Sequence, residues 1–521
     1  FSWKRALGIT SAKRKIAKAT GIPTTQAGFL IRNLRMKHLN YIYIIILLVL
    51  VAACSKDDEG ILDDGSHSQG EGQTSSSVLP GKELRGVWIA TVWGLDWPME
   101  KYNADVQKKL YTDYLDLLVG YNMNAVFFQI RGMADAFYES EYEPWSKYIT
   151  GSAGVRPDYD VLGFLVEEAH KRGIQFHAWL NPYRIATRAN KNAAFPKLDA
   201  KIPMELVKDY EKIRVYNPAL PEVQERIVNI VKEIITKYDV DGIHMDDYFY
   251  PSLEASETMN DGAEFQKYGK DKFKNVEDFR RNNVNTVVRN IQKTIIETRP
   301  EVIFSISPAA DMERNYNTLF ADVNTWAKEG WVDVVIPQLY FATGNDATSF
   351  NLRLDLWSQY TYENHLLIGY GIYKFGDSQY GSKFQSSDDL MKQFELASAK
   401  PKVKGSVLYS AKNLVENKVG IADAVKAIYG KKVLPPYLGR TAAVLPPTPD
   451  NIRLNGADLS WGAVSNVAYY AIYKDNGKER KADLVGITQG TSFKLSEKGV
   501  YFVTSLFKNN AESEISETVS Y

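Results

Sequence analysis

Two neighbouring carboxylates end a short apolar segment in the middle of the chain. Asp246 and Asp247 close the run Asp241–Asp247, and the residues Tyr-Phe-Tyr-Pro follow them. Consecutive strand residues point to opposite faces, so both carboxylates reach one pocket only where the strand is ending. Two close carboxylates raise the pKa of one member, which suits a general acid. Hydrolysis of a glycosidic bond needs such an acid and a second group that supports the developing positive charge. The pair is therefore the leading candidate for catalysis.

Other roles for this pair stay open at the level of sequence. Asp246 could act as a direct nucleophile with a distant acid, either Asp311 or a glutamate in a loop. Alternatively, one member of the pair bonds to Arg131 or Arg184, or caps the following segment. The geometry around the two carboxylates decides among these alternatives.

Further polar and aromatic residues stand near the ends of other apolar runs. Rings stack on the faces of sugars, whereas amides and charged groups bind sugar hydroxyls, so this mixture suits a carbohydrate pocket. Polar residues at strand ends of a barrel otherwise lack a purpose. The candidate substrate-binding residues are Arg85, Trp88, Trp93, Gln129, Arg131, Trp179, Asn181, Tyr183, Arg184, His244, Tyr248, Gln338 and Tyr340.

Eight apolar runs are expected to position these residues. Near-continuous apolar runs are typical of parallel strands buried on both faces, and helical periodicity follows each run. Eight β-α units predict an α/β fold of the TIM (β/α)8 barrel type, because the alternative, a doubly wound sheet, rarely has eight parallel strands. The runs are Leu84–Val92, Ala125–Ile130, Ile174–Leu180, Asp241–Asp247, Ile303–Ser307, Val332–Tyr340, Leu366–Tyr373 and Gly405–Ser410.

Several motifs of this region resemble one known family. The sequences RGVWIATVWGLDWP, FQIRGMADAFY, HAWLNPYR, DGIHMDDYFYP and IPQLYF resemble glycoside-hydrolase-like family 10, also called the DUF187 or YngK-like family. The resemblance covers about Glu83 to Tyr429 and implies a TIM-barrel glycosidase, often a lipoprotein, with at least one relative acting on peptidoglycan strands stripped of peptides. The Asp-Asp pair also resembles enzymes whose nucleophile is the substrate's own N-acetyl group. In those enzymes one carboxylate orients the acetamide and the other protonates the leaving group.

The N-terminal region predicts export and lipidation. Met36-Lys37-His38 begins a basic segment, Tyr41–Val51 is apolar, and Val51-Ala52-Ala53-Cys54 resembles a lipobox in which Cys54 is lipidated. We expect translation to begin at Met36 and the protein to be an outer-membrane lipoprotein that is exposed on the cell surface, because acidic residues follow Cys54. The membrane is thus an expected partner, through the lipid on Cys54.

Charge and composition restrict the remaining function classes. Residues 1–53 hold nine basic and no acidic residues, so the rest of the chain has 54 basic against 63 acidic residues, a net charge of −9. An acidic protein does not suit a phosphate backbone, and we expect no nucleic-acid partner. One cysteine and few barrel histidines predict no zinc site and no other metal or cofactor.

The chain divides into five expected segments. Residues 1–53 are an upstream extension with the signal peptide, 54–80 a flexible tether, 81–432 the barrel, 433–449 a proline-rich linker, and 450–521 a β-sandwich. The sandwich resembles a fibronectin type III module with Trp461 in its core and strands at Ala457–Trp461, Tyr469–Tyr473, Ser492–Leu495 and Tyr501–Ser505.

These observations lead to one expected function and two alternatives. We expect a glycoside hydrolase that acts on a hexosamine-containing glycan, such as peptidoglycan-derived strands, by a retaining and substrate-assisted mechanism. One alternative is hydrolysis of a dietary, algal or host polysaccharide. The other is a non-catalytic, glycan-binding surface lipoprotein.

Overall fold

A computed structural model describes residues 79–521 except 361, 441–442 and 478–480. Cys54, the signal peptide and nearly all of the predicted tether lie outside the described residues. Within the described part of the chain, no helix has both the length and the apolar character needed to cross a bilayer.

Eight parallel strands close into a barrel, which confirms the predicted fold class. Each predicted apolar run overlaps one strand, and the strand order around the barrel is β1-β11-β10-β9-β8-β7-β3-β2. The first and last strands close the barrel in a register that pairs Leu84 with Gly405 and Trp88 with Tyr409. The strands are β1 (Leu84–Ile89), β2 (Ala125–Arg131), β3 (Gln175–Leu180), β7 (Gly242–Met245), β8 (Ile303–Ile306), β9 (Val334–Val335), β10 (His365–Tyr370) and β11 (Val403–Tyr409).

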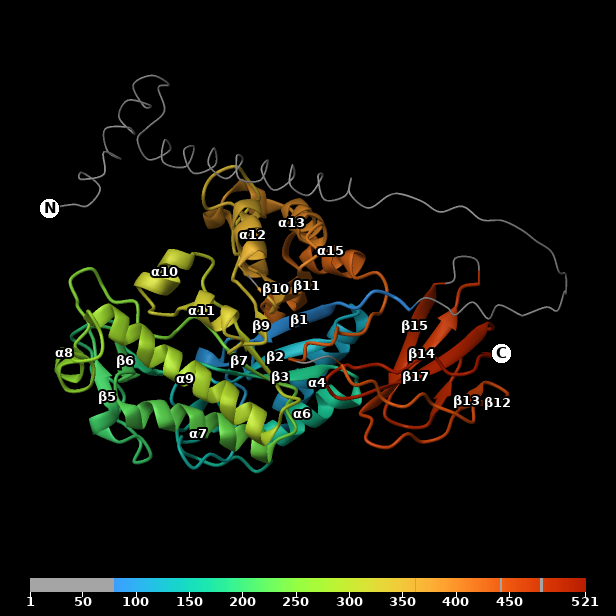
Figure 1. The fold of residues 1–521 in the computed structure, drawn as a ribbon, viewed down its shortest axis with the longest axis horizontal. Coiled ribbons are helices and arrows are strands. Elements are labelled where there is room, and N and C mark those ends of the chain that lie inside the picture. The colour runs from blue at the N-terminus through green and yellow to red at the C-terminus, as the bar shows by residue number, and fades with distance from the viewer. Residues whose placement is uncertain (1–78, 361, 441–442, 478–480) are drawn as a thin grey trace, which may run out of the picture. The chain divides into compact units, whose positions relative to one another are not determined.

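Helices cover the outside of the barrel, and α7 and α9 pack side by side (Figure 1). The sequence explains their limits: Pro221 starts α7, and Asp160 caps α6 by accepting a hydrogen bond from the backbone of Gly163. The main helices are α4 (Ala104–Gly120), α6 (Val161–Lys171), α7 (Pro221–Lys237), α9 (Val276–Thr298), α11 (Val323–Lys328), α12 (Phe350–Gln359), α13 (Asp388–Ser398) and α15 (Ile421–Ile428). The other α-helices, each of six residues or fewer, are α5 (Lys147–Thr150), α8 (Gly262–Glu264), α10 (Met312–Asn317) and α14 (Ala411–Glu416).

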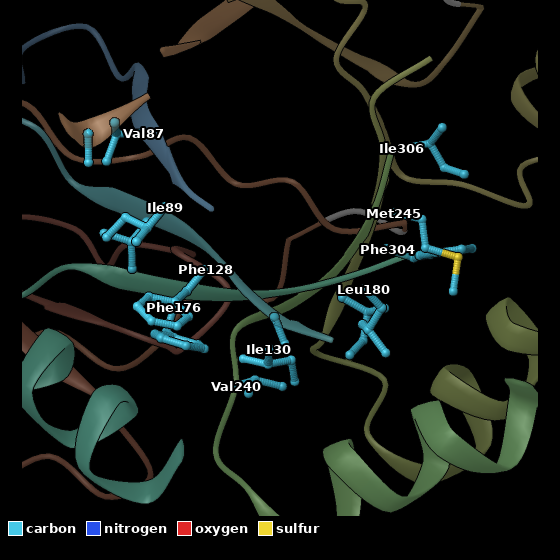
Figure 2. Packing of buried hydrophobic residues seen from close by; sticks show 14 of the residues in the cluster. Val87, Ile89, Phe128, Ile130, Phe176, Leu180, Val240, Met245, Phe304 and Ile306 are labelled. Atoms are coloured by element: carbon cyan, nitrogen blue, oxygen red, sulfur yellow. The ribbon is translucent and has the colours of Figure 1, made fainter. Parts of the chain in front are cut away.

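Alternation along the strands separates two buried layers. Val87, Phe128 and Met245 belong to the cluster between the strands and the helices, part of which Figure 2 shows. Their neighbours Trp88 and Phe127 belong instead to the cluster that fills the barrel interior. Because parallel strands are covered on one face by helices and on the other by the interior, both sets of residues are apolar.

Two long connections follow β3 and β7. The first contains a small antiparallel sheet with the order β4-β6-β5, formed by β4 (Arg184–Thr187), β5 (Val207–Asp209) and β6 (Ile213–Tyr216). The second contains α8 and a π-helical turn over Phe265–Gly269. Both connections begin at the carboxyl ends of barrel strands, where active sites of this fold form.

The C-terminal region forms a small β-sandwich, as predicted. Its two antiparallel sheets have the orders β12-β13-β16 and β15-β14-β17-β18. Trp461 is buried against Tyr470, with 5.3 Å between the ring centroids. The strands are β12 (Arg453–Asn455), β13 (Asp458–Ser460), β14 (Tyr469–Asp475), β15 (Ala482–Thr488), β16 (Ser492–Lys494), β17 (Val500–Leu506) and β18 (Val519–Ser520).

Candidate active site

A pocket of about 280 Å³ lies at the carboxyl ends of the barrel strands. Its lining combines aromatic rings, two amides, one serine hydroxyl, one guanidinium group and two carboxylates, as expected of a carbohydrate site. The lining residues are Trp88, Val92, Trp93, Leu95, Gln129, Trp179, Arg184, Asp246, Asp247, Tyr248, Ser307, Gln338, Tyr340, Tyr373 and Tyr409.

Asp246 follows β7 directly and is held by three N–H donors. The indole Nε1 of Trp179 donates to Oδ2 at 3.0 Å, and the amide Nδ2 of Asn181 donates to Oδ1 at 3.2 Å. The backbone N–H of Tyr248 donates to the same Oδ1 at 3.3 Å. The side chain is almost completely buried, so its oxygens have fixed positions at the base of the pocket.

Asp247 is the more accessible member of the pair. It is half-buried, and its Oδ1 accepts a hydrogen bond from Nε2 of Gln338 at 3.2 Å. The same Nε2 donates to the carbonyl oxygen of Ser307 at 3.0 Å, which fixes the amide between β8 and β9. Asp247 therefore has a defined orientation and still reaches the pocket.

The environment favours the protonated form of both carboxyl groups. Burial, followed by repulsion from Asp247, raises the pKa of Asp246 from 3.8 to about 7, although Arg184 and the N–H groups of Trp179 and Tyr248 act against this rise. Burial also raises the pKa of Asp247, against the hydrogen bond from Gln338. Such a pair titrates as one unit, so it keeps a proton up to near neutral pH.

Aromatic rings form one wall of the pocket. The rings of Tyr340 and Tyr409 are stacked, with 6.0 Å between centroids. Tyr373 stands nearly perpendicular to both, at 5.9 Å and 5.8 Å. Flat apolar faces of this kind suit the C–H faces of pyranose rings.

Trp93 presents an exposed indole at the mouth of the pocket. It is 55% exposed and has a φ of 57°, a left-handed conformation that is unfavourable for a bulky residue. Oε1 of Gln129 holds this turn by accepting from the backbone N–H groups of Thr91 and Val92, at 3.0 Å and 2.8 Å. Strain held by neighbouring contacts is a feature of ligand-binding positions.

The structure brings most of the predicted site residues together. Beside the acid pair, eight of the thirteen predicted substrate-binding residues line the pocket: Trp88, Trp93, Gln129, Trp179, Arg184, Tyr248, Gln338 and Tyr340. The other five do not line it, and for these the prediction of direct contact with substrate is corrected.

Two of the five are arginines with structural partners. Arg85 is the second residue of β1 and therefore lies at the amino end of the barrel, where its guanidinium group donates to the carbonyl oxygen of Tyr429 at 3.3 Å. Arg131 is fully buried and forms an ion pair of 2.8 Å with Glu143, which is also fully buried. Neither side chain has a donor left in a position to bind a sugar in the pocket.

The remaining three residues are buried beside or beneath the pocket. His244 is fully buried and bonds to Nε1 of Trp88 at 3.0 Å and to Oγ of Ser305 at 2.8 Å. Tyr183 is completely buried in the layer outside the barrel. Asn181 is also buried, but it acts on the site indirectly, because its amide links Asp246 to the backbone N–H of Arg184.

The alternative acid Asp311 lies outside the pocket lining. Its carboxylate caps α10 and pairs with Arg353 at 3.0 Å. The backbone N–H of Arg314 contributes most to holding the pKa of Asp311 below its usual value, so this residue remains ionised and does not suit a general acid. The structure therefore contradicts this alternative.

Three pocket-lining residues with hydroxyl groups were not among the substrate-binding residues predicted from the sequence: Ser307, Tyr373 and Tyr409. These residues stand at the ends of the fifth, seventh and eighth predicted runs, so their positions along the chain carried the signal. Tyrosine is equally common in cores, and residue type alone did not distinguish them from packing residues.

A closed parallel barrel with an acid pair and an aromatic wall at the carboxyl ends of its strands defines a TIM-barrel enzyme of the glycoside hydrolase class. Residues 83–386 match the family described as glycosyl hydrolase-like 10. The chain belongs to this family and is a glycoside hydrolase, so the non-catalytic alternative is not retained.

Individual relatives extend this result over most of the chain. The glycosyl hydrolase YngK of Bacillus subtilis is 36% identical over 476 residues, which cover 84% of this chain and 93% of that protein. The glycosyl hydrolase DigH of Escherichia coli K12 is 31% identical over 408 residues, which cover 70% and 91%. The glycoside hydrolase domain of PgaB (BpsB) from Bordetella bronchiseptica aligns with a TM-score of 0.42 and 12% identity, covering 67% of this chain and 99% of that one.

Proposed function

We propose that the enzyme hydrolyses a hexosamine-containing glycan, namely strands derived from peptidoglycan, with retention of the anomeric configuration and with the substrate's N-acetyl group as nucleophile. The observation that carries this proposal is the position of Asp246 and Asp247. Among the described residues that line the pocket, these two are the ones with carboxylate side chains, and both directly follow strand β7.

The arrangement of the pair supports an internal nucleophile. Direct displacement with retention needs two carboxyl groups on opposite sides of the scissile bond, about 5 Å apart. Consecutive residues at one strand end approach a substrate from the same side. The second side of the anomeric carbon is then left to a group of the substrate itself, and an N-acetyl oxygen is suitably placed for this attack.

The contacts of the two carboxylates assign their roles. Both oxygens of Asp246 accept N–H groups, and the acetamide N–H of a bound substrate adds a further donor, so in the substrate complex Asp246 is ionised and the shared proton lies on Asp247. Asp247 protonates the leaving oxygen while the acetamide oxygen attacks the anomeric carbon and forms an oxazoline. Asp246 accepts the acetamide N–H and stabilises the positive charge. Asp247 then takes a proton from the water that opens the oxazoline.

Substitution of each carboxylate tests the proposal. We expect Asp246→Asn and Asp247→Asn to lower kcat/KM on peptide-free peptidoglycan strands by roughly 10²- to 10⁴-fold, because each removes an acid–base or orienting function. Asp311→Asn is the control and should keep wild-type activity. Full activity in both pocket variants would refute the site.

A change in the substrate tests the nucleophile separately. Replacing the N-acetyl group by N-trifluoroacetyl weakens the acetamide oxygen as a nucleophile, so the rate should fall while binding persists. An unchanged rate would return the nucleophilic role to Asp246. Hydrolysis of a plant, algal or host polysaccharide, with peptidoglycan strands left intact, would reject the proposed substrate and indicate nutrient capture.

We also propose that the enzyme is an exported outer-membrane lipoprotein, exposed on the cell surface. This proposal is supported by the lipobox-like Val51-Ala52-Ala53-Cys54 and the acidic residues after it. Metabolic labelling with an alkynyl fatty acid should mark the wild type and leave Cys54→Ser unmarked. Labelling of the serine variant would contradict lipidation at this position.

A further inference from the structure

The pocket contains a buried guanidinium group without a carboxylate partner. Four arginines are buried in the described part of the chain, and three of them form ion pairs: Arg85 with Glu83, Arg131 with Glu143, and Arg214 with Asp209. The fourth is Arg184, which is 8% exposed and lines the pocket. Within the described residues, no carboxylate oxygen comes within the ion-pair distance of 4.0 Å from it.

Among the side-chain contacts that Arg184 makes, the one with Tyr248 also involves a hydrogen bond to the tyrosine hydroxyl, and the other N–H donors of the guanidinium group stay available. Its guanidinium carbon lies 3.8 Å from the ring centroid of Tyr248, a stacking contact that uses the flat face of the group. Its backbone N–H is held by Oδ1 of Asn181 at 3.0 Å. Its side-chain Nε is buried and has no hydrogen-bond partner among the residues that the structure describes.

Such an arrangement is unfavourable in the empty pocket. A buried polar group without a hydrogen bond destabilises the folded state, and a buried charge without a partner does so more strongly. Each unsatisfied buried group in a native protein calls for an explanation, and for a group that lines a pocket a ligand can supply the missing partner. The stacked, planar guanidinium is already oriented, and its fork of N–H donors matches the two oxygens of a carboxylate.

We propose that Arg184 binds a carboxylate on the sugar next to the scissile bond, so that the enzyme is specific for carboxylate-bearing glycans. The proposal rests on the proposed function and deepens it by naming the chemical group that the site recognises. Two sources supply this group: the lactyl ether of a hexosamine and the C6 carboxylate of a hexuronic acid.

The acid pair is compatible with an anionic substrate. Because burial raises the pKa of both Asp246 and Asp247, the pair does not carry two negative charges near neutral pH, and repulsion of a substrate carboxylate is reduced. Arg184 acts on both carboxyl groups only through longer-range attraction. A role solely as their counter-ion is the competing explanation.

Matched substrates separate the two explanations. Kinetics of the full chain should be compared on peptide-free peptidoglycan strands, on the same strands with their carboxylates converted to methylamides, on chitin oligosaccharides, and on a hexosamine–hexuronate polymer. We expect wild-type kcat/KM to fall by roughly 10²- to 10³-fold on amidation, as for loss of one partner in a buried ion pair. Which anionic polymer is cleaved identifies the source of the carboxylate.

Two variants complete the test. Arg184→Gln should hydrolyse native and amidated strands at similar low rates. Arg188→Gln is the matched control from the same connection, because its donors bind the backbone carbonyls of Glu211, Ala193 and Tyr210 and not the pocket. This control should retain the wild-type preference. If Arg184→Gln folds poorly, Arg184→Lys keeps the charge without the planar fork and should retain only part of the preference.

The outcomes distinguish this inference from the proposed function. Equal hydrolysis of native and amidated strands by the wild type, or a preference that persists in Arg184→Gln, would overturn the inference and leave the hydrolase proposal intact. If Arg184→Gln changes only the pH profile of the rate, Arg184 acts as a counter-ion of the acid pair, and this result would also overturn the inference of carboxylate binding. Equilibrium binding of native and amidated strands to Asp247→Asn tests the preference for the carboxylate without turnover. If this variant binds native strands more tightly and the wild type hydrolyses neither kind of strand, the inference is supported and the proposed function is rejected.

Discussion

Replacing Asp246 with asparagine should change how the stability of the barrel depends on pH. Burial and the neighbouring Asp247 raise the pKa of this carboxyl group from 3.8 to about 7 in the folded protein. Between these two values the folded chain holds a proton that the unfolded chain has released. The stability contributed by this group is therefore present at low pH and is lost as the pH rises towards 7.

The size of this effect follows from the difference between the two pKa values. One pKa unit corresponds to about 1.4 kcal/mol, so a rise of about three units corresponds to roughly 4 kcal/mol of unfolding free energy. The group is 3% exposed, so solvent screening does not reduce this figure appreciably. Asparagine does not titrate, and Asp246→Asn should lack this part of the pH dependence.

Urea denaturation between pH 4.5 and pH 7.5 measures the effect. Tryptophan fluorescence mainly reports unfolding of the barrel, because among the described residues the sandwich contains one tryptophan, Trp461, and the other tryptophans belong to the barrel domain. The unfolding free energy of wild type minus that of Asp246→Asn should fall by several kcal/mol across this range and level off near pH 7. Asp311→Asn is the control. Because the pKa of Asp311 lies below its usual value, this group stays ionised across the range, and the unfolding free energy of wild type minus that of Asp311→Asn should stay constant. A constant difference for Asp246→Asn as well would refute the reasoning.

Three further substitutions test other parts of the structure. Trp179→Phe removes an N–H donor to the acid pair, a bond worth about 1.5–3 kcal/mol, so the basic limb of the pH–rate profile should move upward by about one to two units. Arg131→Met removes the 2.8 Å ion-pair partner of the buried Glu143, which then keeps only an ion-pair contact of 3.8 Å with Arg226, and should lower the unfolding free energy by about 3–5 kcal/mol in urea titrations. Gly242→Ala places a Cβ 2.2 Å from Nδ1 of His177 in the filled barrel interior, and should destabilise the barrel by about 1–3 kcal/mol in thermal unfolding.

A control variant or a contradicting result checks each of these predictions. Trp88→Phe also removes an indole donor from the same pocket, but that donor binds His244 at 3.0 Å, so the pH profile should not move. Equal shifts in the two tryptophan variants would contradict the role of Trp179. Stability unchanged in Arg131→Met or Gly242→Ala would show that the packing around Glu143 or His177 relaxes freely.

The order and type of the barrel strands could be predicted because the hydrophobic pattern is local. Runs such as Ala125–Ile130 are apolar on both faces, and this property depends only on neighbouring residues. Their limits were harder to predict. The run Val332–Tyr340 contains a strand of only two residues, Val334–Val335, because Pro337 has no N–H for the ladder and parallel pairing resumes only as isolated bridges at Gln338.

Site residues were predictable only where their position along a strand was clear. The acid pair and Trp179 stand at carboxyl ends of strands, and the structure places them in the pocket. Arg85 stands only one residue after the start of β1, but the sequence does not mark whether a polar residue precedes or follows the centre of a run. Arg131 stands at a strand end, yet Glu143, its buried partner, comes from a connection whose path no local pattern reveals.

The sandwich shows the same limit for short strands. Arg453–Asn455 and Val519–Ser520 are edge strands with little burial, so their sequences lack a strong alternating pattern. Ala482–Thr488 was also missed, and it contains Gly486, which is unusual within a strand. Pairing with Tyr469–Asp475 stabilises this strand, and that pairing is a tertiary property.

Each of the eight barrel strands, or the segment directly after it, contributes a residue to the pocket, from Trp88 on the first strand to Tyr409 on the last. A chain whose last barrel strand has not yet paired, or one truncated before Tyr409, has no complete pocket to offer a substrate. Turnover therefore reports that the whole barrel has closed, and partly folded forms of the enzyme cannot cleave a glycan.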